Sequence, residues 1–337
     1  MVTIISGIAL LLITLAAFSL FSLKMPKGQA AMSGMANAAV ATFLVEAIMS
    51  YIAGDLFGIS FFKDVGSIAG GMGGVAAAAL VPMGMGASPV LSMCAGVAVG
   101  GYGILPGFIA GYVVGLIGPA IEKKLPEGLD VIVGALAVAS VARAIAAFVN
   151  PGVTMVLSII GKTITEATLT SPIIMGFLLG GIIKMICTSP LSSMALTAML
   201  GLTGLPMGIA AVACFGGSFT NGTIFKRLHF GNNGNVIAVM LEPLTQADIV
   251  TTHPIPIYGS NFFGGGIAGV GAAMLGIVNN APGTASPIPG MLAPFAFNAP
   301  GKVVMALAIA AVGGGIAGFI GSIVFKKFDE GAKSVRI

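Results

Sequence analysis

Charge is what this sequence lacks most. Asp, Glu, Lys and Arg together make up 8% of its 337 residues, against roughly 25% in soluble globular chains. Hydrophobic residues make up 57%, tryptophan is absent and the mean hydropathy is +1.06. Apolar windows of about 20 residues, the length that crosses a bilayer as a helix, recur along the whole chain. A soluble fold is excluded, and a β-barrel is disfavoured because the apolar runs do not alternate with polar residues.

Several functional signatures are missing as well. There is no G-x-x-x-x-G-K-[ST] motif and no soluble segment long enough for an ATPase domain. There is neither an arginine-rich voltage-sensor helix nor a T-V-G-Y-G filter. Cys94, Cys187 and Cys214 lie in apolar surroundings without C-x-x-C spacing, which predicts packing residues instead of a metal or disulfide set. We therefore expect no cofactor and no metal.

The few charges indicate the topology. Residues 2–23 form one apolar run, too long for a signal peptide, and Lys24 and Lys27 follow it. Positive residues favour the cytoplasmic side, so we expect the N-terminus outside. Lys326 and Lys327 near the C-terminus favour a cytoplasmic end. The net charge of +4 belongs mostly to such loops and the tail, which indicates a bilayer and no nucleic acid as partner. We predict a multi-pass plasma-membrane protein.

The fold class predicted is an all-α polytopic membrane protein with about nine to eleven transmembrane helices. Residues 1–149 are expected to form an N-terminal membrane half, and residues 172–337 a C-terminal half. Residues 150–171 mix Lys, Thr and Glu with Ile and Val, which predicts an amphipathic or interfacial linker between the halves. Arg143, inside an apolar span, is expected to pair with a carboxylate because an unpaired buried charge is costly.

Glycine is abundant, with 51 residues. The small-xxx-small spacing of Gly70 with Gly74, and of Gly265 with Gly269, lets helices approach closely. Two stretches combine glycine with proline and cannot form regular helix: residues 82–89, P-M-G-M-G-A-S-P, and residues 279–290, N-N-A-P-G-T-A-S-P-I-P-G. Broken backbone at membrane depth is tolerated only inside protein or beside a water-filled cavity.

These two stretches belong to an apparent internal repeat with an offset near 200 residues. Residues 73–80 parallel residues 268–275, and G-A-S-P at 86–89 matches T-A-S-P at 284–287. A basic end follows each copy, so each reads as glycine-rich helix, broken hairpin, helix and basic end. Paired Gly/Pro-interrupted segments point to the binding site of a transporter. We predict two re-entrant hairpins, at 82–100 and 279–298.

The hairpins supply the first candidate substrate contacts. Asn279, Asn280, Thr284 and Ser286 carry amide and hydroxyl groups beside flexible backbone, and Ser88 is their counterpart in the N-terminal copy. Polar groups of this kind would suit a hydroxyl-rich solute. Helix capping is the alternative role for one of the asparagines.

A second candidate group lies in M-L-E-P-L-T-Q-A-D-I-V-T-T-H-P-I-P. It contains Glu242, Asp248 and His253. Ionisable groups inside a membrane are functional-site hypotheses by default, so Glu242 could accept hydrogen bonds from a substrate or act as a base. The alternative, that this segment is an extramembrane loop with solvated charges, stays open.

Two motifs of the C-terminal half carry a family resemblance. H-P-I-P-I-Y-G-S-N-F-F-G-G-G at 253–266 and G-I-V-N-N-A-P-G-T-A-S-P-I-P-G at 276–290 resemble the membrane (EIIC) subunits of bacterial phosphotransferase systems. They are most similar to the stand-alone EIIC-like proteins that include toxin-regulator-like members. The glucose-type carriers have a G-I-T-E-P-like motif, of which only L-E-P at 241–243 is present. The missing part of the motif counts against a phosphoryl-transfer role of Glu242.

The resemblance implies more than the residues themselves do. It implies a homodimer with a scaffold part and a moving part, and a sugar site built from re-entrant hairpins. It also implies that a separate EIIB protein phosphorylates the sugar, with EIIA as a further soluble partner. Carried onto this chain, it makes Glu242 and His253 polar contacts to the sugar. Asn261, inside the first motif, is a further candidate contact. Residues 279–286 would form a hairpin tip.

Three functions follow as hypotheses. The first is a sugar-translocating EIIC component that works by alternating access, with Glu242 as a catalytic candidate if phosphorylation occurs. The second is an ion-coupled secondary transporter of an unmodified polar metabolite. The third is a membrane regulator that senses a ligand without moving it.

Overall fold

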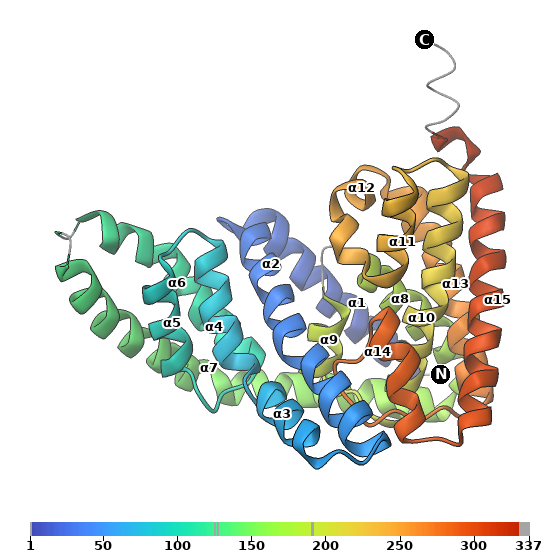
Figure 1. Cartoon of the computed structure of the whole chain (residues 1–337), viewed down its shortest axis with the longest axis horizontal. Coiled ribbons are helices and arrows are strands. Elements are labelled where there is room, and N and C mark those ends of the chain that lie inside the picture. Colours follow the sequence, from blue (N-terminus) through green and yellow to red (C-terminus); the bar gives the residue numbers. More distant parts are fainter. Residues whose placement is uncertain (1, 125, 127, 190–191, 330–337) are drawn as a thin grey trace, which may run out of the picture. The chain divides into compact units, whose positions relative to one another are not determined.

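The computed structural model describes residues 2–124, 126, 128–189 and 192–329 (Figure 1). All regular structure within these ranges is helical, so the prediction of an all-α protein is confirmed. The chain folds into two compact units, each built from more than one stretch. Unit 1 comprises residues 1–11, 162–193 and 202–337, and unit 2 comprises residues 12–161 and 194–201.

Unit 2 holds the helices of the first half of the chain. They are α2 (Gly28–Ala39), π-helical segments Val40–Leu44 and Ala47–Leu56, α3 (Ser60–Gly71), α4 (Gly73–Gly84), α5 (Pro89–Ala98) and α6 (Ile104–Lys124). Three helices contribute residues to both units: α1 (Val2–Lys24), α7 (Leu129–Thr170) and α9 (Ser193–Met199).

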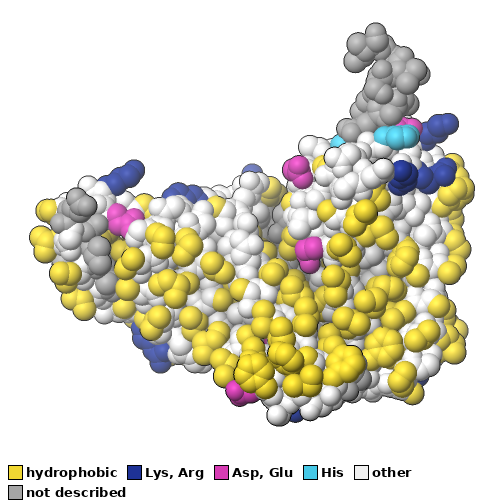
Figure 2. All heavy atoms as spheres, viewed as in Figure 1, with side chains coloured by type: hydrophobic (Ala, Val, Ile, Leu, Met, Phe, Trp, Pro, Cys, Tyr) yellow, Lys and Arg dark blue, Asp and Glu magenta, His cyan; other side chains and the backbone are white. Residues whose placement is uncertain are grey.

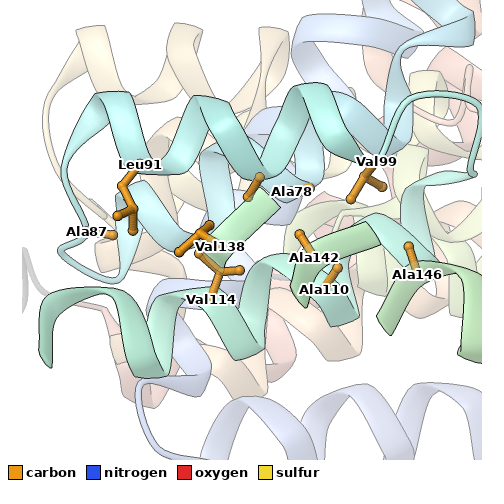
Figure 3. Close-up of a cluster of buried hydrophobic side chains, with 10 residues drawn as sticks. Ala78, Ala87, Leu91, Val99, Ala110, Val114, Val138, Ala142 and Ala146 are labelled. Atoms are coloured by element: carbon orange, nitrogen blue, oxygen red, sulfur yellow. The ribbon is translucent and has the colours of Figure 1, made fainter. Parts of the chain in front are cut away.

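The core of unit 2 consists of small and branched apolar side chains. Figure 3 shows Ala78 of α4, Leu91 of α5, Val114 of α6 and Ala142 of α7 in one cluster. The alanines let the helix backbones approach closely, as is common where helices pack inside a membrane.

Arg143 differs from its prediction. Its guanidinium donates hydrogen bonds to the carbonyl oxygens of Ala98 (3.2 Å) and Gly100 (2.8 Å) and lies 4.5 Å from the ring centroid of Tyr102. Ala98 is the last residue of α5, where carbonyl groups have no partner within the helix, and Gly100 lies in the turn that follows. The arginine therefore caps α5. The expected carboxylate partner is replaced by carbonyl dipoles and an aromatic face.

Unit 1 holds the helices of the second half. They are α8 (Pro172–Thr188), α10 (Gly204–Arg227), α11 (Asn233–Leu241), the 3-10 helix η3 (Pro243–Gln246), α12 (Ala247–Thr252), α13 (Pro254–Met274), α14 (Pro287–Leu292), η4 (Ala293–Ala296), α15 (Pro300–Val324) and η5 (Lys326–Phe328). Helix α13 packs against α8, α10 and α15, and α10 also packs against α14 (Figure 1).

Proline and glycine mark the ends of these helices. Five helices, α5, α8, α13, α14 and α15, begin with proline in their first turn, where no amide hydrogen is needed. Gly86 (φ 98°) and Gly276 (φ 56°) directly follow the C-cap residues of α4 and α13. The next amides, of Ala87 and Ile277, bond to carbonyl oxygens five residues back, which is the Schellman pattern. A left-handed glycine therefore follows each of these helices. The predicted breaks are shorter than expected, because residues 82–84 belong to α4 and residues 287–290 belong to α14.

Residues 150–171 are largely part of a longer helix. They continue α7, which runs for 42 residues through Pro151. Proline removes only one hydrogen bond, and the helix continues past it. The predicted linker is thus the second part of one helix that contributes to both units.

Six helices of the described residues are long and apolar enough to cross a membrane, or seven if the bent pair α3 and α4 counts as one span. Large hydrophobic side chains are exposed on several of them, such as Ile132, Phe148 and Phe319. Figure 2 shows hydrophobic side chains over much of the visible face, with acidic and basic ones sparse. A surface of this kind suits lipid. The protein is a multi-pass membrane protein, and the nine to eleven crossings stay a prediction.

Candidate functional site

The broken stretch after α13 is held in shape by its own asparagines. No helix covers residues 277–286. The fully buried Asn279 side chain donates from its amide nitrogen to the Thr284 hydroxyl (2.8 Å) and accepts from the Ala281 amide (3.0 Å). Thr284 in turn donates to the Ala281 carbonyl oxygen (2.8 Å). Asn279 and Thr284 thus brace the loop from within.

The same loop is attached to the start of α10. The Asn280 side-chain oxygen accepts a hydrogen bond from the backbone amide of Gly204 (3.1 Å). The backbone amide of Asn279 donates to the Gly204 carbonyl oxygen (3.0 Å). A Cβ atom on Gly208 would collide with the Ile277 carbonyl group. The predicted alternative, that an asparagine caps a helix, is what Asn280 does here.

Glu242 and Ser286 are brought together by the fold. Glu242 lies between α11 and η3, and Ser286 precedes α14. The Ser286 hydroxyl donates to Glu242 Oε2 (3.1 Å), and the Leu244 amide donates to Oε1 (3.4 Å). Two residues predicted from separate motifs therefore meet in unit 1.

Burial changes the acid strength of Glu242. Desolvation raises the pKa of its carboxyl above the usual value, and this outweighs the lowering by the Leu244 amide, the Ser286 hydroxyl and the Lys184 ammonium. A raised pKa brings a carboxyl closer to neutral operating conditions, which suits a group that exchanges a proton with a substrate.

Lys184 is the residue that the sequence analysis missed. It lies on α8 and its side chain is fully buried. The ammonium has the Cys187 thiol as its hydrogen-bond partner at 4.0 Å. No carboxylate of the described residues lies within 4.0 Å of it. The cation is nevertheless close enough to Glu242 to influence that carboxyl.

Two glycines make room for the Lys184 side chain. A Cβ atom on Gly217 of α10 would overlap Lys184 Cδ and Cε, and one on Gly265 of α13 would overlap its Cβ. The lysine stem therefore passes between three helices where only glycine leaves space. Gly265 was predicted to let helices pack closely. In the structure it faces the Lys184 side chain of α8.

The buried cysteines extend this cluster. The Cys187 thiol interacts with the Cys214 thiol and with the Ser193 hydroxyl. Ser193 donates to the Ala285 carbonyl oxygen (2.5 Å), next to Ser286. A continuous set of polar contacts thus joins Lys184 to the loop that carries Ser286. All three cysteines are free, and two of them, Cys187 and Cys214, line a polar cluster.

Asn261 belongs to a second buried polar group. Its amide nitrogen donates to Asn221 Oδ1 (2.6 Å) and to the Ile257 carbonyl oxygen (2.8 Å). Among the described residues, Asn261 Oδ1, Asn221 Nδ2 and the hydroxyls of Ser218 and Ser260 are buried without a hydrogen-bond partner. Such groups cost about 1–3 kcal/mol each unless something satisfies them. Water or a polar solute would do so.

This second group is adjacent to the lysine. Asn221 follows Gly217 by four residues on α10, and Asn261 precedes Gly265 by four on α13. Residues four apart share a helix face. Asn221 therefore lies one turn from Gly217 on the same face of α10, and Asn261 lies one turn from Gly265 on the same face of α13. The lysine stem of α8 contacts both glycines.

His253 and Ser88 have structural neighbours of their own. The His253 ring stacks on Phe230 with centroids 4.1 Å apart, and its Nδ1 lies 3.2 Å from the Ile249 carbonyl oxygen. Ser88 accepts from the Leu91 amide (3.4 Å) as the N-cap of α5, in unit 2. Their predicted contacts to a substrate stay predictions.

The sequence of the whole membrane region supports one family. The family described as phosphotransferase system, EIIC, matches residues 29–334. The chain belongs to this family. No curated protein and no solved structure is significantly similar to it. The resemblance drawn from the C-terminal half is thereby confirmed, and the EIIC family in general implies a sugar-type substrate and EIIB and EIIA partners.

Proposed function

We propose that this EIIC protein moves a sugar or sugar derivative by alternating access through a site formed by Glu242, Ser286 and Lys184. The carrying observation is the hydrogen bond between Glu242 and Ser286, beside a buried lysine. Carboxylate, hydroxyl and ammonium groups together offer the acceptors and donors that a polyol needs. The orphaned polar atoms of Asn221 and Asn261 add further partners for hydroxyl groups.

We also propose that phosphorylation accompanies transport. A phosphoryl group would pass from a phosphorylated EIIB protein to a substrate hydroxyl, and Glu242 would accept the proton that this hydroxyl loses. The raised pKa of Glu242 supports this role. His253, Asn279, Asn280, Thr284 and Ser88 are kept as substrate contacts in this proposal, the hairpins at 82–100 and 279–298 as re-entrant elements of an internal repeat, and a homodimer as the assembly.

Uptake into proteoliposomes tests the function. The purified full-length protein, reconstituted with a panel of radiolabelled hexoses and hexose derivatives, is expected to move at least one of them, and to release it phosphorylated when phospho-EIIB and EIIA are supplied. Glu242→Gln is expected to lower the phosphorylation rate by about 10²- to 10⁴-fold, the usual contribution of a general base.

Asp248→Asn is the matched control, because Asp248 is exposed on α12 near Glu242 in sequence. It should leave uptake and phosphorylation unchanged. Uptake of unmodified solute driven by a Na⁺ or H⁺ gradient would establish the ion-coupled alternative. Ligand binding without movement in sealed vesicles would establish the sensor.

A further inference from the structure

Lys184, which belongs to the proposed site, is a buried ammonium whose one hydrogen-bond partner is a thiol. Lys184 is fully buried, and its ammonium can donate three hydrogen bonds. The Cys187 sulfur, at 4.0 Å, is a weak acceptor. Burial of a charge is costly unless the charge is paired and hydrogen-bonded. The described residues leave this cation short of acceptors.

Glu242 does not neutralise Lys184. The two groups are not an ion pair within 4.0 Å. The carboxyl oxygens of Glu242 are already taken by the Ser286 hydroxyl and the Leu244 amide. Among the described residues, no carboxylate therefore pairs directly with the Lys184 ammonium.

The space for the lysine is built into three helices. Gly217 and Gly265 accept its stem where any larger residue would collide with it. Glycine in a helix costs roughly 1 kcal/mol relative to alanine. An apolar side chain in this space would fold at least as well, so packing alone does not explain a lysine here.

We propose that the solute carries an anionic group, a carboxylate or a phosphate, which binds the Lys184 ammonium. The proposal rests on the proposed transport function and names its substrate class: an acidic or phosphorylated sugar in place of a neutral one. The anionic group supplies the missing acceptors, and the sugar hydroxyls bind Glu242, Ser286 and the orphaned amide atoms of Asn221 and Asn261.

A series of sugars that differ at one carbon tests the proposal. D-glucose, D-glucuronate and D-glucose 6-phosphate share a ring and differ at C6, and D-galactose with D-galacturonate provides a second pair. Their affinities for the purified full-length protein are measured by isothermal titration calorimetry. We expect at least one anionic sugar to bind about 10-fold or more tightly than its neutral counterpart. Preference for the glucuronate or for the 6-phosphate identifies the anionic group.

Lys184→Met is the decisive variant, because methionine fills the same narrow space without the charge. It should abolish the preference for the anionic sugar and change the affinity for the neutral one less than 3-fold. Neutral sugars that bind as tightly as the anionic ones in the wild type, or a preference that survives in Lys184→Met, would overturn the proposal. Neither result would touch the proposed transport function, which the uptake assay tests separately.

A second variant tests the proposal if the Lys184→Met protein does not fold. Gly217→Ala places a methyl group against the lysine stem and displaces the ammonium. It should weaken binding of the anionic sugar by 10-fold or more and leave the neutral sugar nearly unaffected. Equal losses for both sugars contradict the proposal. Gly315→Ala, on a helical glycine with nothing within 4 Å of its added Cβ, is the control.

Discussion

At the scale of single residues, the site depends on the balance between burial and hydrogen bonding at Glu242. Burial favours the protonated carboxyl, whereas the Ser286 hydroxyl and the Leu244 amide favour the ionised one. Burial is the largest effect, so the folded protein holds the Glu242 proton more tightly than the unfolded chain does. Proton binding and folding are consequently linked.

This linkage predicts how stability depends on pH. Because the folded-state pKa of Glu242 is raised, its favourable contribution is fully present below the unfolded pKa, about 4.3, and is lost as the pH rises through the folded pKa. Glu242→Gln resembles the protonated carboxyl at every pH. We expect the variant to be the more stable protein at pH 8 and the difference to shrink towards pH 5, as measured by thermal unfolding in detergent.

Asp248→Asn is the comparison for this experiment because Asp248 is exposed. The difference in thermal stability between Asp248→Asn and the wild type should not change with pH in the same way. A Glu242→Gln protein that is less stable than the wild type at pH 8, and equally so at pH 5, would show that the ionised carboxyl stabilises the fold.

The sequence predicted part of the candidate site at this scale. Glu242, Asn279 and Ser286 were recognisable because polar groups are rare in an apolar chain. Lys184 was not, because a lysine in an apolar helix also occurs where the side chain reaches back to the membrane surface. Its burial depends on Gly217 and Gly265, which come from two other helices. Only the tertiary structure brings these three residues together.

At the scale of elements, glycines set the distances between helices. A Cβ atom on Gly180 of α8 would lie 2.5 Å from the Gly265 carbonyl oxygen of α13, and one on Gly176 would lie 2.8 Å from that of Gly269. The predicted packing role of the Gly265 and Gly269 pair is thus seen in the contact between α8 and α13. Between α10 and α15, Gly216 and Gly314 make a similar approach.

Two consecutive glycines of α15 provide a direct test. A Cβ atom on Gly314 would collide with the Gly216 carbonyl group, whereas one on Gly315 would meet nothing within 4 Å. Gly314→Ala should lower the free energy of unfolding by about 1–3 kcal/mol, the usual cost of overpacking. Gly315→Ala should raise it by up to about 1 kcal/mol, because alanine is the better helix former.

Thermal unfolding of the two variants in one detergent measures the comparison. Equal effects of the two substitutions would mean that helix propensity alone, without close packing, decides stability at this position. The prediction needs no ligand and is independent of the proposed function.

Helices were easier to predict than their ends and continuity. Apolar runs located most helices. Proline and glycine located both breaks only in part, because residues 82–84 and 287–290 are helical. The boundary predicted between residues 149 and 150 falls inside helix α7, because Asn150, Pro151 and the polar residues after them resemble a linker. The backbone hydrogen bonds on both sides of Pro151 hold the helix together, and no composition pattern reports them.

At the scale of the whole molecule, charge marks one end of unit 1. Helix α10 ends with Lys226 and Arg227, and Lys326 and Lys327 follow α15. Basic side chains lie there in Figure 2, at the upper end of α15. The positive-inside rule predicts that this end faces the cytoplasm.

Fusions to the C-terminus test this orientation. Green fluorescent protein fused after Ile337 is expected to fluoresce in cells, and alkaline phosphatase at the same position to be inactive, because the first needs the cytoplasm and the second the oxidising exterior. The preference of the C-terminus for the cytoplasmic side should become weaker when glutamine replaces Lys226, Arg227, Lys326 and Lys327. An active phosphatase fusion in the unmodified protein would reverse the predicted topology.

The membrane class and the family were predictable from the sequence, but the crossings were not. Composition required a bilayer, and the motifs at 253–266 and 276–290 indicated the EIIC family. Several apolar segments proved to be short helices, such as α5 with 10 residues and α11 with 9. At about 1.5 Å per residue, neither covers a hydrocarbon core of about 30 Å. Apolar composition alone does not separate such segments from full spans.

The path of Lys184 between Gly217 and Gly265 has a mechanical consequence. A helix that slides along its neighbour by one turn moves about 5.4 Å. On α10 such a slide would replace Gly217 by Asn221, four residues on, and the lysine stem would meet this larger side chain. We therefore predict that α8 and α10 resist sliding past each other and move together in any motion of unit 1.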